Sequence, residues 1–477
     1  MRAAELLRQD GAAMADAVRR REVTATALVE ASLARITATD ARVNAFTERT
    51  SSRALQRAAA IDRQLASDGG TALSALPLLG VPFAVKNLFD IAGVTTLAGS
   101  RIERGSPPAA RDGLLVERME AAGAVLVGAL NMDEYAYGFT TENSHEGPTR
   151  NPHDLTRIAG GSSGGSGAAV AAGQVPITLG SDTNGSIRVP SSLCGVFGLK
   201  PTYGRLPRTG SYPFVASLDH LGPFARSARD LALGYDAMQG PDPHDPACAQ
   251  RPVEPTAPRL PLGLDGLQAA VLGGYFAEHA GPQARSAVAL VAAALGATRQ
   301  VELPEVARAR AAAFLITNSE GANLHLADLK RRPQDFEPLS RDRFLAGALL
   351  PASWVVQAQR VRHWFARQAA QAFESVDLLV APATPLPATP IGSEWIEVNG
   401  QRLPARPSTG LLAQPISCIG LPVCCVPVWL PGEPLPIGVQ LIAAPWREDL
   451  VLRAAAALET AGVVRSPVAA LGEESHR

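Results

Sequence analysis

The sequence predicts an α/β protein, because segments of helical periodicity alternate along the chain with short apolar segments typical of buried strands. A length of 477 residues and a hydrophobic content of 46% are enough for a large core. A formal net charge of −1 gives no electrostatic reason to expect nucleic acid or an anionic membrane as a partner. We therefore expect a soluble α/β enzyme, and we expect any partner to be recognised by shape.

The N-terminal half of the chain begins this alternation. Its helical segments are rich in alanine and carry apolar residues at helical spacing. The segments between them are short and almost wholly apolar, which is typical of strands buried on both faces. Helices are expected at 25–46, 54–65 and 113–122, buried strands at 78–85 and 124–128, and the start of a helix at 166–172.

The C-terminal half continues the pattern after a proline-rich stretch. Closely spaced prolines in residues 241–261 favour an exposed connection rather than a domain boundary. No internal repeat is evident. Strands are then expected at 267–272, 377–380 and 437–442, and helices at 284–295, 307–330 and 352–373.

Cysteine and histidine residues give no sign of a metal site. The five cysteines have neither metal-ligand spacing nor the pattern of a secreted disulfide framework. Cys424 and Cys425 stand in an apolar run, where cysteine acts as a small buried hydrophobic residue. His145 and His153 lack a partner at metal-ligand spacing, so we expect them to make local hydrogen bonds in loops. Neither a metal nor another cofactor is expected.

The N-terminus does not resemble a targeting segment. Charged residues among the first ten stand too close together for a signal peptide. No apolar run approaches the length of a membrane span. We therefore expect a cytoplasmic protein without membrane contact.

Residues 160–190 are rich in glycine and serine and place two serines in turns. Ser162 and Ser186 are 24 residues apart, and Lys86 precedes Ser162 by 76 residues. A serine hydroxyl is a weak nucleophile until a base takes its proton, and a lysine held neutral by burial can be that base. Lys86 follows the apolar run 78–85, so a buried strand would place it where its pKa falls. The alternative is a surface lysine at a strand end.

The segment from Ser181 to Ser186 is small and polar, so its backbone can turn sharply. The N–H groups of Thr183, Asn184 and Gly185 would then form an oxyanion hole for a tetrahedral intermediate on Ser186. The alternative is a turn without chemistry. That alternative explains neither the second serine turn nor the lysine.

Together these residues resemble the signature of the amidase signature family. The resemblance implies one large α/β unit with a large mixed central β-sheet covered by helices on both faces. It implies a single amidase domain over 1–477, with a signature core at about 75–230. A C-terminal part at about 262–465 would complete the sheet and the substrate pocket. Further similar stretches are 131–134, 141–144, 147–152, 195–202 and 438–441.

The resemblance implies a role for each of three residues. Lys86 would be a neutral base, and Ser162, preceded by a cis peptide bond, would relay the proton because a hydroxyl both donates and accepts. Ser186 would attack the amide carbonyl, the leaving nitrogen would take the proton, and water would release the acyl group.

Asn184 departs from the pattern, since many members of the family carry glycine there. Asparagine tolerates left-handed backbone geometry, so the turn can survive. Within the family, this turn and the stretches 137–143 and 394–400 are similar to those of the 1-carboxybiuret hydrolases of cyanuric acid breakdown. The resemblance implies a small urea-like carboxylated amide as the substrate, with release of ammonia.

A carboxylated substrate calls for an arginine, whose planar fork matches a carboxylate at two points. Arg188 is nearest to Ser186 in the sequence, and its alternative role is a structural salt bridge to Asp182. Arg343 stands in a region resembling the amide-substrate side of related amidotransferase subunits, although most arginines in such helices are solvated. Tyr137 could line the pocket or belong to the core.

Three other functions fit parts of the sequence. Gly161 to Gly165 formally matches the G-x-S-x-G elbow of α/β-hydrolases with Ser163 as the nucleophile, but residues 154–158 make a poor buried strand. A glutaminase subunit of an aminoacyl-tRNA amidotransferase would share the lysine and both serines. A catalytically silent scaffold subunit would have no chemical need to keep all three.

The resemblance also bears on partners. The 1-carboxybiuret hydrolases and the amidotransferase subunits both work beside a small helical protein. We therefore expect an accessory subunit resembling the amidotransferase C subunit, an oligomer, and no direct contact with nucleic acid.

Overall fold

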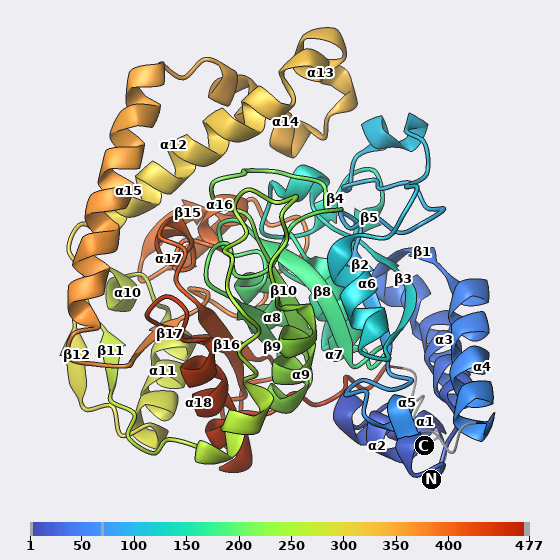
Figure 1. Ribbon diagram of the computed structural model, residues 1–477. Helices are drawn as coiled ribbons and strands as arrows, with labels where there is room; N and C mark the ends of the chain where they lie inside the picture. The colour runs from blue at the N-terminus through green and yellow to red at the C-terminus, as the bar shows by residue number, and fades with distance from the viewer. Residues whose placement is uncertain (1–2, 68–70, 472–477) are drawn as a thin grey trace.

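A mixed β-sheet of eleven strands runs through the part of the chain that the computed structural model describes, residues 3–67 and 71–471 (Figure 1). Strands pair in parallel in two groups of three, and all other neighbours in the sheet, including the two strands at one edge, pair antiparallel. The predicted α/β class and large mixed sheet are confirmed. In sheet order the strands are β1 (Phe46–Arg49), β3 (Val125–Leu130), β2 (Pro82–Lys86), β8 (Ile177–Asp182), β10 (His220–Ala225), β9 (Phe197–Lys200), β16 (Val423–Val428), β17 (Ile437–Ala443), β13 (Leu378–Pro382), β11 (Ala269–Leu272) and β12 (Arg299–Val301).

Helices cover both faces of this sheet (Figure 1). Two neighbouring residues of β16 illustrate this, because successive side chains of a strand point to opposite faces. Cys425 Sγ lies 3.5 Å from the carbonyl oxygen of Arg188 in α8, whereas Cys424 lies toward Glu459 in α18. Both cysteines are buried and free, as predicted. The helices are α1 (Ala3–Leu6), α2 (Gly11–Arg19), α3 (Ala25–Val43), α4 (Ser51–Ser67), α5 (Thr71–Ser74), α6 (Leu114–Ala121), α7 (Gly164–Ala171), α8 (Arg188–Cys194), α9 (Ala228–Met238), α10 (Tyr275–Glu278), α11 (Pro282–Ala294), α12 (Val306–Leu324), α13 (Leu326–Arg331), α14 (Pro338–Ala348), α15 (Ala352–Ala372), α16 (Ala405–Ser408), α17 (Gln414–Cys418) and α18 (Glu448–Thr460).

Two predicted helices end differently from the expectation. The helix expected at 25–46 stops at Val43, because Asn44 takes the left-handed conformation with φ of 57° and donates its N–H to Asp40 O. Phe46 then starts β1. The helix expected at 307–330 is two helices that meet at His325, whose ring packs 3.9 Å from that of Tyr135.

The proline-rich connection lies mostly at the surface, as predicted, but two of its acidic residues are buried. Asp242 accepts from Thr209 Oγ1 at 2.5 Å, and Asp245 forms an ion pair with Arg208 at 2.8 Å. These contacts hold the connection against the loop between β9 and β10. In the described part of the chain, no helix is both long and apolar enough to cross a membrane.

One edge of the sheet gathers charged residues. Lys86, Asp182 and Lys200 are the last residues of β2, β8 and β9, which run in the same direction. His220 begins β10, which is antiparallel to β8 and β9, so it lies at the same edge. Carboxyl ends of such strands are where α/β proteins bind ligands.

Candidate active site

The Lys86 side chain is fully buried at the end of β2. Its Nζ donates to Ser162 Oγ at 2.7 Å and to Ser181 Oγ at 2.8 Å. Burial lowers the pKa of Lys86 to about 7, although nearby carboxylates act in the opposite direction. A large share of this lysine is therefore neutral near pH 7, and the alternative of a surface lysine is wrong.

Ser162 stands in the turn between β7 (Asp154–Ile158) and α7, after a cis Gly161–Ser162 peptide. Its carbonyl oxygen accepts from Asp133 N at 3.2 Å. A side chain at position 161 would meet Asp133 Oδ2 at 2.1 Å and Thr140 N at 2.6 Å. Glycine at 161 thus lets the backbone approach Asp133 and carry the Ser162 hydroxyl to Lys86.

Ser163, the nucleophile of the α/β-hydrolase alternative, is the residue just before α7. Its hydroxyl donates to Ser181 O at 3.1 Å. The preceding strand β7 pairs with β6 (Arg150–Asn151) in a small two-stranded sheet, which is not part of the central sheet. A nucleophile elbow needs a buried strand of the main sheet before it, so this geometry does not fit the elbow.

The turn after β8 is folded by the Asp182 carboxylate. Its Oδ1 accepts from Gly185 N at 2.8 Å and its Oδ2 from Ile187 N at 3.2 Å. Gly185 has φ of +138°, and a side chain there would meet Ala413 Cβ at 2.7 Å. The turn presents Ser186, which is 2% exposed.

The three predicted oxyanion donors are therefore not equivalent. The N–H of Gly185 is already used by Asp182. The backbone N–H groups of Thr183 and Asn184 have no acceptor among the described residues, and neither has that of Ser186, which the sequence analysis missed. Within the described chain no hydrogen bond joins Ser186 to Ser162.

Arg188 is buried, and its whole guanidinium donates hydrogen bonds to other residues of the protein. Nε and Nη2 each donate to Asp182 at 3.0 Å. Nη1 donates to Gln440 Oε1 at 2.7 Å and Ala413 O at 2.9 Å, and Nη2 also donates to Ser417 Oγ. All five N–H groups are used, so the geometry gives the structural salt bridge and leaves no donor for a substrate carboxylate.

The ion pair controls the charge of Asp182. Burial alone would raise the pKa of this carboxyl, but the guanidinium of Arg188, with its hydrogen bonds, holds the pKa well below its usual value. Asp182 therefore stays ionised at neutral pH and continues to accept from the turn.

Ser186 lines a small pocket together with Asn184, Tyr137 and Arg343. Aromatic residues close the pocket, and they are Phe139, Phe214 and Phe314. No aspartate or glutamate lines it in the part of the chain described here. The structure thus brings two of the three proposed substrate residues beside Ser186 and leaves Arg188 behind it.

The Arg343 guanidinium stacks on Tyr137, with Cζ 4.0 Å from the ring centroid. Its Nη1 donates to Tyr137 O at 3.4 Å, and among the described residues it has no carboxylate partner. Burial lowers the pKa of Arg343 and raises that of Tyr137. The Tyr137 hydroxyl donates to Asn318 Oδ1. A guanidinium without a counter-ion thus faces the pocket.

A buried acidic network holds α14, which carries Arg343. Glu134 Oε2 accepts from Glu337 N at 2.8 Å and from Ser340 Oγ at 2.7 Å. Arg406 bridges Glu337 at 3.1 Å and Asp133 at 2.9 Å. The sequence analysis quoted 131–134 as a family stretch but gave Glu134 no role, and it missed Arg406 and Glu337.

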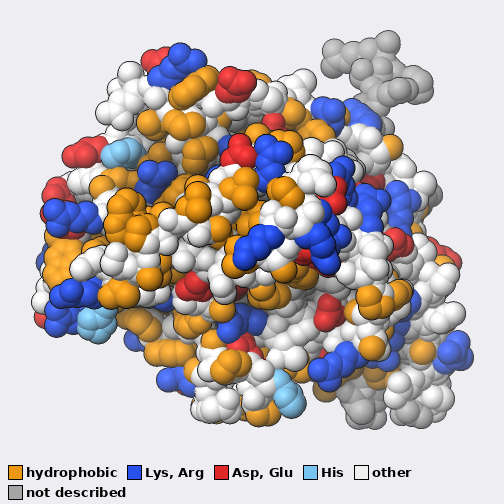
Figure 2. Space-filling model, turned by 90° about the horizontal axis from the view of Figure 1, so that it is seen from above, with side chains coloured by type: hydrophobic (Ala, Val, Ile, Leu, Met, Phe, Trp, Pro, Cys, Tyr) orange, Lys and Arg blue, Asp and Glu red, His pale blue; other side chains and the backbone are white. Residues whose placement is uncertain are grey.

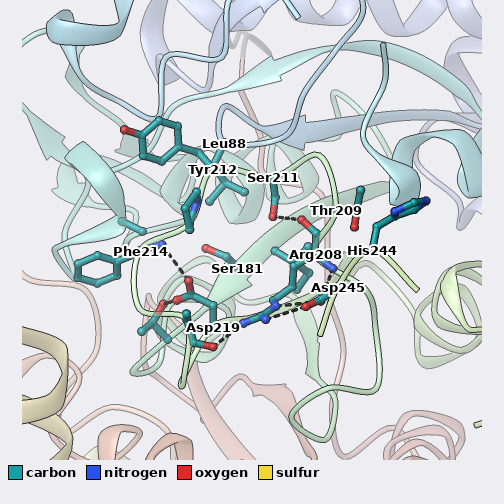
Figure 3. A pocket seen from close by; sticks show the side chains of 15 residues that line it. Leu88, Ser181, Arg208, Thr209, Ser211, Tyr212, Phe214, Asp219, His244 and Asp245 are labelled. Atoms are coloured by element: carbon teal, nitrogen blue, oxygen red, sulfur yellow. Dashed lines mark hydrogen bonds and ion pairs between the residues drawn. The ribbon is translucent and has the colours of Figure 1, made fainter. Parts of the chain in front are cut away.

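A second cavity of about 190 Å³ lies beside the pocket (Figure 3). The two share Ala136, Thr183 and Phe214 as wall residues. Ser181, one of the partners of Lys86, lines this second cavity, as does Asp219, which accepts from Thr183 Oγ1 at 2.6 Å. The two cavities are therefore neighbours, with Ser186 in the wall of one and Ser181 in the wall of the other.

Histidines and cysteines behave as structural residues. Both make hydrogen bonds, but the partner of the His153 ring is not local: His145 Nε2 lies 3.1 Å from Glu134 Oε1, and His153 Nε2 lies 3.1 Å from the carbonyl oxygen of Cys194, 41 residues further along the chain. The described residues contain no group of three or more histidine, cysteine or acidic side chains that could hold a metal ion.

The sheet and this site define an amidase, and the chain belongs to that family: the family model described as Amidase matches residues 27–452. It is an amidase signature enzyme, a hydrolase that acts on amide C–N bonds. The alternative of a silent scaffold is thereby set aside.

Two relatives and one solved structure narrow the comparison. The chain is 61% identical over 438 residues to the AtzE subunit of 1-carboxybiuret hydrolase from Pseudomonas sp. (strain ADP), covering 91% of this chain and 95% of that protein. It is 39% identical to the A subunit of glutamyl-tRNA(Gln) amidotransferase from Roseiflexus sp. (strain RS-1), covering 92% and 93%. A structure described as an unexpected vestigial protein complex revealing the evolutionary origins of an s-triazine catabolic enzyme matches with a TM-score of 0.94 at 57% identity, covering 96% of this chain and 99% of its own.

Replacing Asp182 by asparagine is expected to lower the free energy of unfolding by about 3–5 kcal/mol, because Arg188 would remain as a buried charge without a counter-ion. Chemical denaturation measures this loss. Asp154→Asn is the control, since it breaks a half-exposed pair with Arg157 and should cost less than about 1 kcal/mol. Equal losses in the two variants would contradict a structural role for the buried pair.

Proposed function

We propose that this enzyme hydrolyses 1-carboxybiuret, or a closely similar urea-like carboxylated amide, and releases ammonia. The observation that carries the proposal is the buried contact between Lys86 and Ser162 behind a pocket lined by Ser186 and by an unpaired arginine. The 61% identity to a 1-carboxybiuret hydrolase subunit supports the choice of substrate.

Lys86 and the two serines perform the proton transfers in this proposal. Neutral Lys86 takes a proton through the Ser162 hydroxyl, which accepts one proton from Ser186 Oγ as it passes its own to the amine. Ser186 Oγ attacks the amide carbonyl and forms a tetrahedral intermediate. The proton then returns through the same path to the leaving nitrogen, so that ammonia departs and an acyl-enzyme remains. Water attacks the ester by the reverse transfers and frees the acid.

Backbone donors stabilise the charge that develops on the carbonyl oxygen. The free N–H groups of Thr183 and Asn184 supply this oxyanion hole, with that of Ser186 in place of the occupied N–H of Gly185. Because Asp182 holds the turn, these donors need no reorganisation when the substrate arrives.

Arg343 binds the substrate carboxylate, and the ring of Tyr137 supports its guanidinium. The described residues that line the pocket include no acid, which also argues against glutamine, because its α-ammonium would lack a counter-ion. A glutaminase, favoured by the 39% identity to the A subunit of an amidotransferase, is the second candidate.

A small helical subunit would complete the enzyme in the cell. The solved relative is described as a protein complex. Large apolar side chains are exposed just after α14 and on α15, where Leu349 is 84% and Trp354 is 54% exposed. Seen from above, the molecule shows hydrophobic side chains among charged ones (Figure 2). Exposed apolar residues of this size are typical of surfaces that bind other proteins.

Ser186→Ala is expected to reduce ammonia release from 1-carboxybiuret by at least about 10³-fold, because the variant lacks the attacking oxygen. The assay compares 1-carboxybiuret, biuret, allophanate, malonamate and glutamine with wild type and variant in parallel. Ammonia from glutamine but not from 1-carboxybiuret would favour the second candidate. Release that survived in the variant would remove Ser186 as the nucleophile.

The pH dependence of kcat/KM should report the titration of Lys86. A base must be neutral to accept a proton, so kcat/KM should fall tenfold per pH unit below about pH 7 and level off above it. Lys86→Ala should lower kcat/KM by at least about 10²-fold and remove its fall below pH 7. Lys330→Ala, at an exposed position, should change neither kcat/KM nor its pH dependence. A Lys86→Ala enzyme with the wild-type rate would contradict the proposed base.

Arg343→Gln is expected to weaken recognition of carboxylated amides selectively. A charged hydrogen bond contributes about 1.5–3 kcal/mol, so kcat/KM for 1-carboxybiuret should fall by roughly 10- to 150-fold. For biuret, which has no carboxylate, it should change less than about threefold. Arg341→Gln on the same helix, where the arginine pairs with Asp342 at the surface, is the matched control. Equal effects on the two substrates would assign Arg343 a structural role.

A further inference from the structure

The Asn184 side chain contains a buried acceptor without a partner. The residue is 7% exposed and lines the same pocket as Ser186. Its Nδ2 donates to Thr317 Oγ1 at 2.8 Å, whereas its Oδ1 has no hydrogen bond within the described chain. Leaving a buried acceptor unsatisfied is costly, so such a group is expected to have a partner when the protein works.

The other side-chain amides of the pocket do not share this property. Asn318 Oδ1 accepts from the Tyr137 hydroxyl, and Gln414 Oε1 accepts from Arg310 Nε at 2.8 Å. Asn184 Oδ1 is therefore the amide oxygen of the pocket lining that remains for a ligand, as far as the structure describes it.

We propose that Asn184 Oδ1 accepts a hydrogen bond from an N–H group of the substrate. The enzyme would thereby select amides that carry nitrogen, rather than carbon, next to the carbonyl that Ser186 attacks. This inference rests on the proposed function. A substrate with its carboxylate on Arg343 and its scissile carbonyl at Ser186 would place its internal N–H groups between them. Asn184 lies in that pocket, two residues before Ser186.

The chemistry of the selection is simple. In biuret and its carboxylated relatives an N–H flanks the scissile carbonyl, whereas malonamide and malonamate carry a methylene there. A methylene cannot donate, so it would leave the buried oxygen unpaired and desolvated. Sites built to pair with a substrate N–H reject analogues that lack it for this reason.

Thr317 acts on the selection as a positioning residue. Its hydroxyl oxygen, on α12, accepts from Nδ2, and in this orientation of the amide Oδ1 has no partner among the described residues. Without this contact the amide could rotate and present N–H donors to the ligand in place of its oxygen. The selectivity should therefore depend on the Thr317 hydroxyl even though Thr317 need not touch the substrate.

The test measures binding in the absence of turnover. Calorimetry with the full-length Ser186→Ala protein gives the dissociation constants of biuret and malonamide, which differ only in the N–H or methylene group. Biuret should bind about 10-fold or more tightly than malonamide. Asn184→Gly in the same background keeps the backbone N–H and should reduce this preference to less than about threefold. Thr317→Val should reduce it as well, and Thr317→Ser should retain it.

Asn399→Gly, at an exposed turn with φ of 51°, is the matched control and should keep the full preference. Three results would overturn the inference. The Ser186→Ala protein could bind biuret and malonamide with equal dissociation constants, or bind neither of them. The ratio of the two dissociation constants could also stay the same in both Asn184→Gly and Thr317→Val. These outcomes are separate from failure of the proposed function, which appears as absence of ammonia release from 1-carboxybiuret by the wild-type enzyme.

Discussion

Burial of the Lys86 amine is the constraint on which the rest of this architecture depends. An ammonium removed from water is unstable unless it is paired, and a neutral amine is stable only if polar groups receive it. Here two serine hydroxyls, from the glycine-rich turn and from β8, surround Nζ at 2.7 and 2.8 Å. The sheet order places β2 directly beside β8, so one of these hydroxyls is supplied by the neighbouring strand itself.

The ion pair of Asp182 and Arg188, at the same edge of the sheet, has a different role, because it holds the shape of the turn after β8. A turn that aims several N–H groups outward needs an internal acceptor to hold its shape. Asp182 supplies that acceptor, and Arg188 keeps it ionised while tying the turn to β17 and α17 through Gln440 and Ser417. Both charges are therefore used within the protein, which is why Arg188 cannot also serve a ligand.

Local pattern was enough to predict the α/β class and the approximate position of most elements, and the family resemblance implied the contact between Lys86 and Ser162. The end of α3 was missed because apolar periodicity continues past Asn44, whereas the backbone turns there. The salt bridge of Arg188 to Asp182 was one of the two roles expected, but its other acceptors lie more than 200 residues away, where no local pattern reveals them. The second partner of Lys86 and the network around Glu134 depend on tertiary packing in the same way. The domain limits drawn from the sequence stay a prediction.

The polar groups that line the pocket limit the kinds of ligand that it can bind. Among the described side chains of the lining, the Arg343 guanidinium has no carboxylate partner and Asn184 Oδ1 has no donor, whereas the amide oxygens of Asn318 and Gln414 already accept hydrogen bonds. A complementary ligand offers a carboxylate and a neutral N–H, and no ammonium, because no acidic residue lines the described pocket. A carboxylated urea has that combination, whereas an α-amino acid has the carboxylate but brings a cation. The balance of charges around Ser186 thus favours the urea-like substrate on grounds independent of sequence similarity.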